Sequence, residues 1–312
     1  MRKKILLINP PNPPDYISNK DMMGGMGQLY HIPNQVRVPI MDMLYVASIL
    51  RNRGYGIFVL DCNADDLAVE ELSKKVRTLE FDSIVMRTSV PTLDWDLEMA
   101  RILKSQFRTT MIFFGSACQF ETKKLRSNQT VDDFVQGDAE IELPILLENK
   151  WNGKEQGRRK EDIKFTPASF DSLPLPAWDL FPYHKYLLEP ELKDLTPQAI
   201  IVTSRGCPYQ CGYCPYPVTQ GAKWLARSAK SVARELHYLD QELGIKFVLF
   251  RDPEFSLRKN QVLEICREIR QMKLSLKWRC ETRVDTLDEE LLQEMAFAGC
   301  IGINMGIESV SP

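Results

Sequence analysis

Three cysteines lie close together in the middle of the chain, in the segment Thr203-Ser-Arg-Gly-Cys-Pro-Tyr-Gln-Cys-Gly-Tyr-Cys-Pro-Tyr-Pro217. Cys207, Cys211 and Cys214 have the spacing Cys-x-x-x-Cys-x-x-Cys. Thiolates hold iron–sulfur clusters, and a four-iron cluster usually takes four of them. Because no fourth cysteine stands nearby, the spacing predicts a cluster with one iron left open. An open iron can bind and reduce a substrate or cofactor, whereas a fully ligated cluster only carries electrons.

Zinc is the alternative metal for these thiols. Zinc sites usually combine a Cys-x-x-Cys pair with a second pair or with histidines. The sequence has no second pair, and His184 and His237 have no ligand spacing to the motif. The motif therefore favours iron–sulfur chemistry over zinc. The other five cysteines are scattered, and we expect them to be small, buried apolar residues: Cys62, Cys118, Cys266, Cys280 and Cys300.

The composition indicates an enzyme of the reducing cytoplasm. The 312 residues are enough for about two domains. Lys and Arg number 40 and Asp and Glu 42, so the charge does not favour nucleic acid or an anionic membrane as a partner. No apolar run approaches the roughly 18 residues that span a bilayer. The first apolar run is too short for a secretory signal and is expected to be a buried strand.

Residues 1–150 alternate apolar runs with amphipathic stretches. This pattern predicts a parallel sheet covered by helices on both faces, which is a doubly wound, Rossmann-like domain. Gly54 is expected to end the first long helix. We expect strands at 4–9, 57–60, 83–86, 111–114 and 133–135, and helices at 39–53, 65–79 and 93–107.

Small and polar residues follow the expected strands of this first domain. Ligands of doubly wound domains bind beyond the carboxyl ends of the strands, and small residues there let a large flat ligand approach the backbone. Ordinary strand-to-helix turns are the alternative interpretation. No Gly-x-Gly-x-x-Gly follows the first strand, so nucleotide binding is not indicated. The residues at these ends are Asn9-Pro10-Pro11, Thr88-Ser89, Gly115-Ser116 and Gly137-Asp138.

The second half repeats strand and helix again. Residues 151–196 are interpreted as an ordered, proline-rich linker, since the prolines of 173–182 exclude a regular helix. Residues 197–312 then predict part of a (βα) barrel, whose chemistry belongs at the carboxyl ends of its strands. The chain stops just past a strand, which suggests a truncated barrel. We expect strands at 198–203, 246–250, 277–280 and 301–307, helices at 226–243, 258–272 and 288–298, and end residues Arg251, Asp252, Glu254, Glu281, Arg283, Glu308 and Ser309.

The cysteine motif after a barrel's first strand resembles the radical S-adenosylmethionine (SAM) superfamily. Tyr213 matches the aromatic position that in this family lies beside the adenine, and Gly306-Ile-Glu-Ser309 looks like its fourth-strand motif. Residues 1–150 are similar to the cobalamin-binding domain that precedes the barrel in one large subgroup. That second resemblance is carried by Asn9-Pro10-Pro11, Gly115, Val135-Gln-Gly-Asp-Ala-Glu140 and the proline-rich stretch 173–182.

This resemblance implies a cofactor set and a reaction. Three thiolates would hold a 4Fe-4S cluster whose fourth iron is chelated by SAM, and an electron donor such as a flavodoxin or ferredoxin would reduce it. Reductive cleavage of SAM gives a 5′-deoxyadenosyl radical, which takes hydrogen from an unreactive carbon, and methylcobalamin can then methylate that carbon of a small-molecule substrate. The protein's part is to position the cofactors and exclude water and oxygen.

The resemblance also implies roles for single residues. Asp252 or Glu254 would accept from the SAM ammonium, Arg283 would pair with its carboxylate, and Glu308 would touch the ribose or the methionyl part. A solvated loop charge is the alternative for each acid, and a structural salt bridge is the alternative for Arg283. Cobalamin would lie over Thr88, Ser89, Gly115, Ser116, Gly137 and Asp138.

One motif of many cobalamin domains is missing. Their lower cobalt ligand comes from Asp-x-His-x-x-Gly, whereas the corresponding segment here reads Asp61-Cys-Asn-Ala-Asp65. We therefore expect bound cobalamin to have no histidine of this motif as its lower ligand. Two other functions stay open: a cobalamin-dependent radical cyclase or oxidase, and a non-catalytic module that binds cofactors or carries electrons.

Overall fold

The computed structural model describes residues 2–31, 35–153 and 165–307. Contacts divide the chain into two compact units. Unit 1 comprises residues 1–164 and 173–185, and unit 2 comprises residues 165–172 and 186–312. The chain therefore passes from unit 1 to unit 2 at residue 165, returns to unit 1 at residue 173 and enters unit 2 again at residue 186. The domain limits expected at 150 and 196 stay a prediction.

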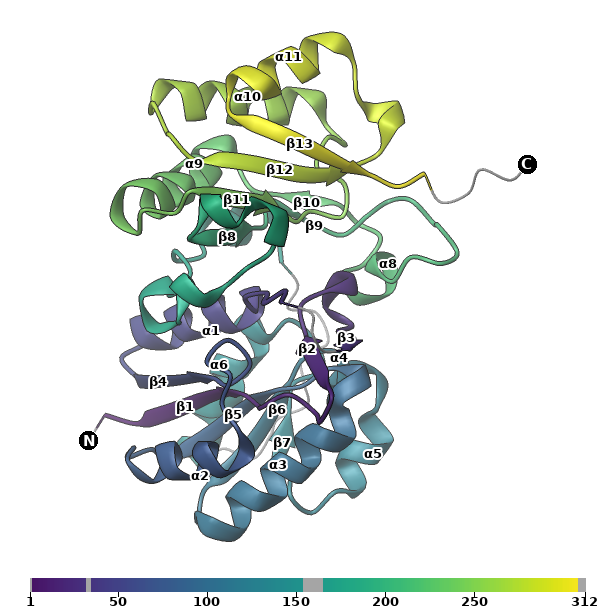
Figure 1. The fold of residues 1–312 in the computed structure, drawn as a ribbon. Helices are drawn as coiled ribbons and strands as arrows, with labels where there is room; N and C mark the ends of the chain where they lie inside the picture. Colours follow the sequence, from purple (N-terminus) through teal and green to yellow (C-terminus); the bar gives the residue numbers. More distant parts are fainter. Residues whose placement is uncertain (1, 32–34, 154–164, 308–312) are drawn as a thin grey trace. The chain divides into compact units, whose positions relative to one another are not determined.

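Unit 1 is built on a five-stranded parallel sheet with the order β4-β1-β5-β6-β7. The expected doubly wound pattern is confirmed, because α2, α3 and α5 cover one face and α1 and α6 the other (Figure 1). The strands are β1 (Lys4–Asn9), β4 (Gly56–Asp61), β5 (Ser83–Arg87), β6 (Thr110–Phe114) and β7 (Asp133–Phe134). The helices are α1 (Met41–Asn52), α2 (Val69–Arg77), α3 (Leu93–Gln106), α4 (Ser116–Phe120), α5 (Thr122–Ser127) and α6 (Ala139–Trp151).

Local sequence explains these elements. The four apolar residues 5–8 of β1 are completely buried, as expected of a strand covered on both faces. In α2, Leu72 and Val76 stand one turn apart and are the buried residues of that helix. After α1, Gly54 adopts φ +90°, which confirms that this glycine ends the helix.

A hairpin of unit 1 was not predicted from the sequence. β2 (Tyr16–Asn19) and β3 (Gln28–His31) pair antiparallel between β1 and α1, and the turn between them contains Gly24, Gly25 and Gly27, all with positive φ. The alternating pattern was too short to stand out beside the longer apolar runs.

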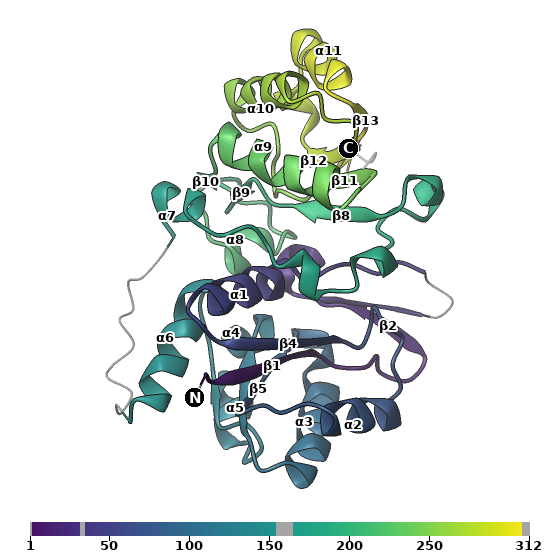
Figure 2. The same ribbon diagram turned by 90° about the vertical axis from the view of Figure 1, so that its left-hand side faces the viewer.

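Unit 2 contains a four-stranded parallel sheet with the order β13-β12-β11-β8. α9, α10 and α11 lie on one face of it (Figures 1 and 2). The expected βα repetition is confirmed. The strands are β8 (Gln198–Ile201), β9 (Ser204–Arg205), β10 (Leu225–Ala226), β11 (Phe247–Phe250), β12 (Lys277–Thr282) and β13 (Cys300–Met305). The helices are α7 (Pro167–Asp171), α8 (Tyr216–Thr219), α9 (Ala229–His237), α10 (Lys259–Gln271) and α11 (Glu289–Phe297).

Side-chain caps begin two of these helices. Ser228 accepts a hydrogen bond from the backbone of Ser231 at the start of α9, and Asp288 accepts one from Leu291 at the start of α11. Cys266 and Cys280 are fully buried in this unit, as Cys62 and Cys118 are in unit 1, while Cys300 is half-buried. Among the residues that the structure describes, no helix has the length and apolar character to cross a membrane.

Candidate cofactor sites at the strand ends

The three cysteines lie on one loop that follows β8. The short strands β9 and β10 pair antiparallel and close this loop at its base. Gly206 has φ +78°, and a side chain there would overlap the carbonyl oxygen of Lys223 on the returning arm. The backbone N–H of Cys207 donates to the carbonyl of Gly221 at 3.1 Å. The glycine therefore allows the two arms to close directly beside the first cysteine.

The environments of the three thiols differ. Cys207 is 7% exposed, whereas Cys211 and Cys214 are half-buried and joined by a turn in which the N–H of Cys214 donates to the carbonyl of Cys211 at 3.1 Å. Burial raises the pKa of the Cys207 thiol, and the nearby negative charges of Cys214, Glu254 and Cys211 raise it further.

The donor set of this loop consists of three thiols, the ligand type that holds iron–sulfur clusters. Within the described ranges, no group of three or more His, Cys, Asp or Glu side chains is arranged to hold a single metal ion. In a four-iron cluster each thiolate binds a different iron, so the sulfurs do not converge on one point. Three soft thiol donors on one loop match the irons of such a cluster.

Asp252 ties the carboxyl end of β11 to the segment that leads into the cysteine loop. It is completely buried, and its Oδ1 accepts hydrogen bonds from the backbone N–H and the hydroxyl of both Thr203 and Ser204. Its Oδ2 is buried and has no hydrogen-bond partner among the described residues. Burial raises the pKa of Asp252 to about 6, although these hydrogen bonds oppose the rise. Its role as a SAM ligand stays a prediction.

Glu254 and Arg283 make contacts within the protein. Glu254 Oε1 accepts from the hydroxyls of Thr282 at 2.5 Å and Thr286 at 3.1 Å and from the backbone N–H of Arg283 at 3.3 Å. The Arg283 guanidinium donates two hydrogen bonds to Asp285, at 2.9 and 2.6 Å. Arg283 also stacks 4.3 Å above the ring centre of Tyr209, which lies between Cys207 and Cys211.

Two other predicted SAM residues are Tyr213 and Glu308. Tyr213, in the cysteine loop beside Cys214, is 66% exposed. Glu308 lies outside the described residues. The structure thus brings Asp252, Glu254 and Arg283 to the carboxyl ends of β11 and β12.

In unit 1, the predicted cobalamin residues follow three neighbouring strands. Thr88 and Ser89 directly follow β5 and are fully buried, and Ser116 after β6 is 8% exposed. A side chain at Gly115, which has φ +113°, would overlap the guanidinium of Arg87. A side chain at Gly137 would overlap the carboxylate of Glu142. The missing side chains at both glycines therefore make room for the protein's own charged groups.

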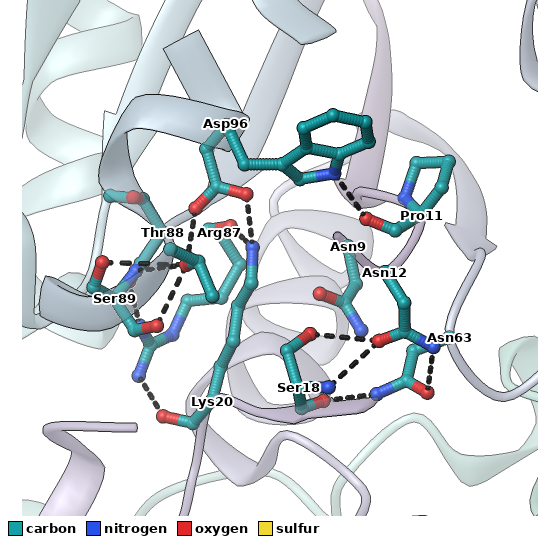
Figure 3. Close-up of polar contacts among 12 residues, drawn as sticks. Asn9, Pro11, Asn12, Ser18, Lys20, Asn63, Arg87, Thr88, Ser89 and Asp96 are labelled. Carbon is teal, nitrogen blue, oxygen red and sulfur yellow. Dashed lines mark hydrogen bonds and ion pairs between the residues drawn. The ribbon is translucent and has the colours of Figure 1, made fainter. Parts of the chain in front are cut away.

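The turn between β2 and β3 covers these strand ends. The hydroxyl of Ser116 donates to the carbonyl of Met26 at 3.0 Å, and a side chain at Gly27 would come within 2.6 Å of the hydroxyl of Ser89. Lys20 reaches into the same place, where its Nζ donates to the carbonyl of Arg87 at 2.8 Å and to Asp96 Oδ1 at 2.7 Å (Figure 3). Lys20 and Asp96 are a buried ion pair, and desolvation lowers the pKa of Lys20 although Asp96 raises it.

Asn63 occupies the place of the histidine in the lower-ligand motif. It is 4% exposed, its amide N–H donates to the carbonyl of Ser18, and its Oδ1 accepts from Asn12 at 3.0 Å (Figure 3). Asn12 in turn accepts from the backbone N–H and the hydroxyl of Ser18. The side chain at this position therefore holds the hairpin.

Comparison with known proteins finds a family model for the second half of the chain and relatives over most of its length. Residues 201–312 match the model of the Radical SAM superfamily. An uncharacterized methyltransferase of Pyrococcus horikoshii is 28% identical over 99% of this chain and 66% of its own length. An anaerobic magnesium-protoporphyrin IX monomethyl ester cyclase of Rubrivivax gelatinosus is 24% identical over 86% of this chain and 51% of its own. The chain therefore spans about half to two thirds of the length of these relatives.

Two solved structures share the fold. OxsB, a cobalamin-dependent SAM radical enzyme solved with aqua-cobalamin and SAM, superposes with a TM-score of 0.74 at 14% identity, over 99% of this chain and 44% of its own. TsrM of Kitasatospora setae is a radical SAM methyltransferase solved with cobalamin and a [4Fe-4S] cluster. It superposes with a TM-score of 0.71 at 17% identity, over 100% of this chain and 62% of its own. At these identities the likeness establishes the arrangement of elements.

Proposed function

Residues 201–312 are a radical SAM domain, and from this premise we propose that the chain is the cofactor-binding part of a cobalamin-dependent radical SAM methyltransferase. The observation that carries the proposal is the combination of a three-cysteine loop after the first strand of this domain with a doubly wound unit before it. OxsB and TsrM share the fold of both units over nearly the whole chain.

The cofactors are a 4Fe-4S cluster, SAM and cobalamin. When bound, the cluster supplies the electron that cleaves SAM, and cobalamin supplies the methyl group. Cys207, Cys211 and Cys214 would hold the cluster, and Asp252 would fix the backbone that leads into their loop through Thr203 and Ser204. The proposed SAM contacts are Tyr213, Asp252, Glu254, Arg283 and Glu308, and the proposed cobalamin contacts are Thr88, Ser89, Gly115, Ser116, Gly137 and Asp138.

The methyl acceptor is proposed to be an unactivated carbon of a small molecule, with a flavodoxin- or ferredoxin-like electron donor. Methyltransferases of Pyrococcus horikoshii and Streptomyces species are among the relatives, which supports methyl transfer. The cyclase of Rubrivivax gelatinosus supports a radical cyclase as the second candidate. The proposed domains are residues 1–150 for cobalamin, 151–196 as a linker and 197–312 for the cluster and SAM.

Anaerobic turnover with methyl-labelled SAM separates these functions. The reconstituted protein is supplied with cobalamin, a strong reductant and a small-molecule extract, and label is followed in the products. If the chain transfers methyl groups, label should appear in a methyl group of a product. If it is a cyclase, SAM should be cleaved and no product should carry the labelled methyl group. If cluster-loaded protein cleaves no SAM, the chain is a non-catalytic module and the proposal is wrong.

A further inference from the structure

A short segment of the predicted linker packs on the base of the cysteine loop. Residues 165–172, which include α7, belong to unit 2, although the chain before and after them belongs to unit 1. α7 contacts β10, the strand that pairs with β9 and closes the loop (Figure 2). This base segment, residues 165–172, therefore lies where it can affect the position of the three cysteines.

Two aromatic side chains of the base segment bind Arg205 of β9. Phe165 and Phe170 are 7% and 1% exposed, and their ring centres lie 5.5 Å apart. The guanidinium carbon of Arg205 lies 4.7 Å from the ring centre of Phe165 and 5.4 Å from that of Phe170. A cation within about 6 Å of a ring centre is attracted by the ring, and more strongly where water is excluded. The outgoing arm of the loop is therefore held by two buried rings.

The base segment also binds the returning arm of the loop. Asp171 Oδ1 accepts a hydrogen bond at 2.7 Å from the backbone N–H of Ser228, the second residue after β10. A hydrogen bond to a charged acceptor is roughly twice as strong as one between neutral groups. Because Arg205 and Leu225 are partners in the β9–β10 pair, the segment is attached to both arms where they meet.

The first cysteine lies directly beyond this base. Gly206 alone separates Arg205 from Cys207, and the N–H of Cys207 is bonded across the loop to the carbonyl of Gly221. A movement of either arm at the base therefore moves Cys207. We propose that the base segment is a clamp that positions Cys207 for the cluster, with Arg205 and Asp171 as its positioning residues. The inference rests on the proposed cluster function and deepens it.

Alkylation of the full chain without iron tests the clamp independently of the cluster. Cys207 is 7% exposed, so iodoacetamide should modify it slowly in the wild type, as followed by peptide mass spectrometry. Arg205→Gln removes the cation and should raise the rate at Cys207 about five- to tenfold. Cys266, a fully buried thiol of the same unit, is the internal reference and should keep its rate. Equal acceleration at Cys266 would show that the contact only stabilises unit 2, and would overturn the clamp.

Asp171 offers a second variant with a matched control. Asp171→Ala removes the acceptor for the N–H of Ser228 and should raise the alkylation rate at Cys207 about three- to fivefold. Asp171→Asn removes the same charge but keeps an acceptor oxygen, so its rate should stay within about twofold of that of the wild type. Equal rates in these two variants, or an unchanged rate in Arg205→Gln, would overturn the clamp.

Iron release connects the clamp to the cluster. The reconstituted Arg205→Gln protein should lose iron to a chelator about five- to tenfold faster than the wild type. Arg270→Gln, which breaks the ion pair with Glu294 between α10 and α11, should release iron at the wild-type rate. Unchanged iron release in Arg205→Gln would overturn the role of the clamp in holding the cluster. A wild type that binds no iron would overturn the proposed function, whatever the alkylation rates are.

Discussion

Asp252 has four hydrogen bonds on one carboxylate oxygen and no described partner on the other. A strand-end acid was predicted here from the sequence, but the direction of its side chain was not, because its partners Thr203 and Ser204 lie 48 to 49 residues away, in the segment that follows β8. The same holds for Glu254, because its hydroxyl partner Thr282 ends the next strand and its partner Thr286 follows that strand. Residue types at strand ends were therefore predictable, and their long-range partners were not.

The raised pKa of Asp252 gives a pH prediction. The pKa rises from 3.8 to about 6 on folding, so the folded state holds the proton more tightly. The contribution to stability is therefore full below pH 3.8 and is lost as the pH rises through about 6. Asp252→Asn keeps an acceptor oxygen but has no charge. As the pH rises from about 4 to about 7, its free energy of unfolding should therefore gain roughly 2–3 kcal/mol relative to that of the wild type. Urea unfolding of both proteins at the two pH values checks this, and a constant difference would contradict it.

Arg283 stacks on Tyr209 within the cysteine loop, and we expect it to hold that loop in place. An exposed cation–π contact is worth about 0.5–1 kcal/mol, so Arg283→Gln should release iron to a chelator about two- to fivefold faster. Arg258→Gln is the control, because Arg258 stacks on Trp224, outside the three-cysteine segment. Equal release rates in Arg283→Gln and the wild type would show that the stacking does not hold the loop.

At the scale of elements, the β2–β3 hairpin is fixed to the sheet by the buried pair Lys20–Asp96. Removing one partner of a buried pair leaves an uncompensated charge, so Lys20→Met should lower the free energy of unfolding by about 3–5 kcal/mol. Lys104→Met breaks the more exposed pair with Asp132 and should cost less than about 1 kcal/mol. Urea unfolding measures both. Similar losses in the two variants would mean that Lys20 does not anchor the hairpin.

The segment Asp61–Asp65 gives a second prediction at this scale. Asn63 is bound to Ser18 and Asn12, so bound cobalamin should have no protein nitrogen on its lower face. The paramagnetic resonance spectrum of the reduced cob(II)alamin form reports such a ligand, because a nitrogen splits its lines. Nitrogen splitting from the protein would contradict the prediction.

At the scale of the whole molecule, both parallel sheets were predictable because buried parallel strands are continuous apolar runs. The β2–β3 hairpin was not, because its alternation is short and its anchors Arg87 and Asp96 lie 67 and 76 residues from Lys20. The smallness of Gly115 and Gly137 was visible in the sequence. The groups that fill the space beside them, Arg87 and Glu142, became apparent only from the fold.

The central claim is that the cysteine loop holds one open four-iron cluster. Iron and sulfide analysis of the anaerobically reconstituted protein tests it most directly, with Cys211→Ala and the triple variant of Cys207, Cys211 and Cys214 measured beside Cys118→Ala, which changes a buried cysteine of unit 1. The wild type and Cys118→Ala should bind about four irons per chain, and the other variants should bind almost none. Full iron binding by the triple variant would contradict the account.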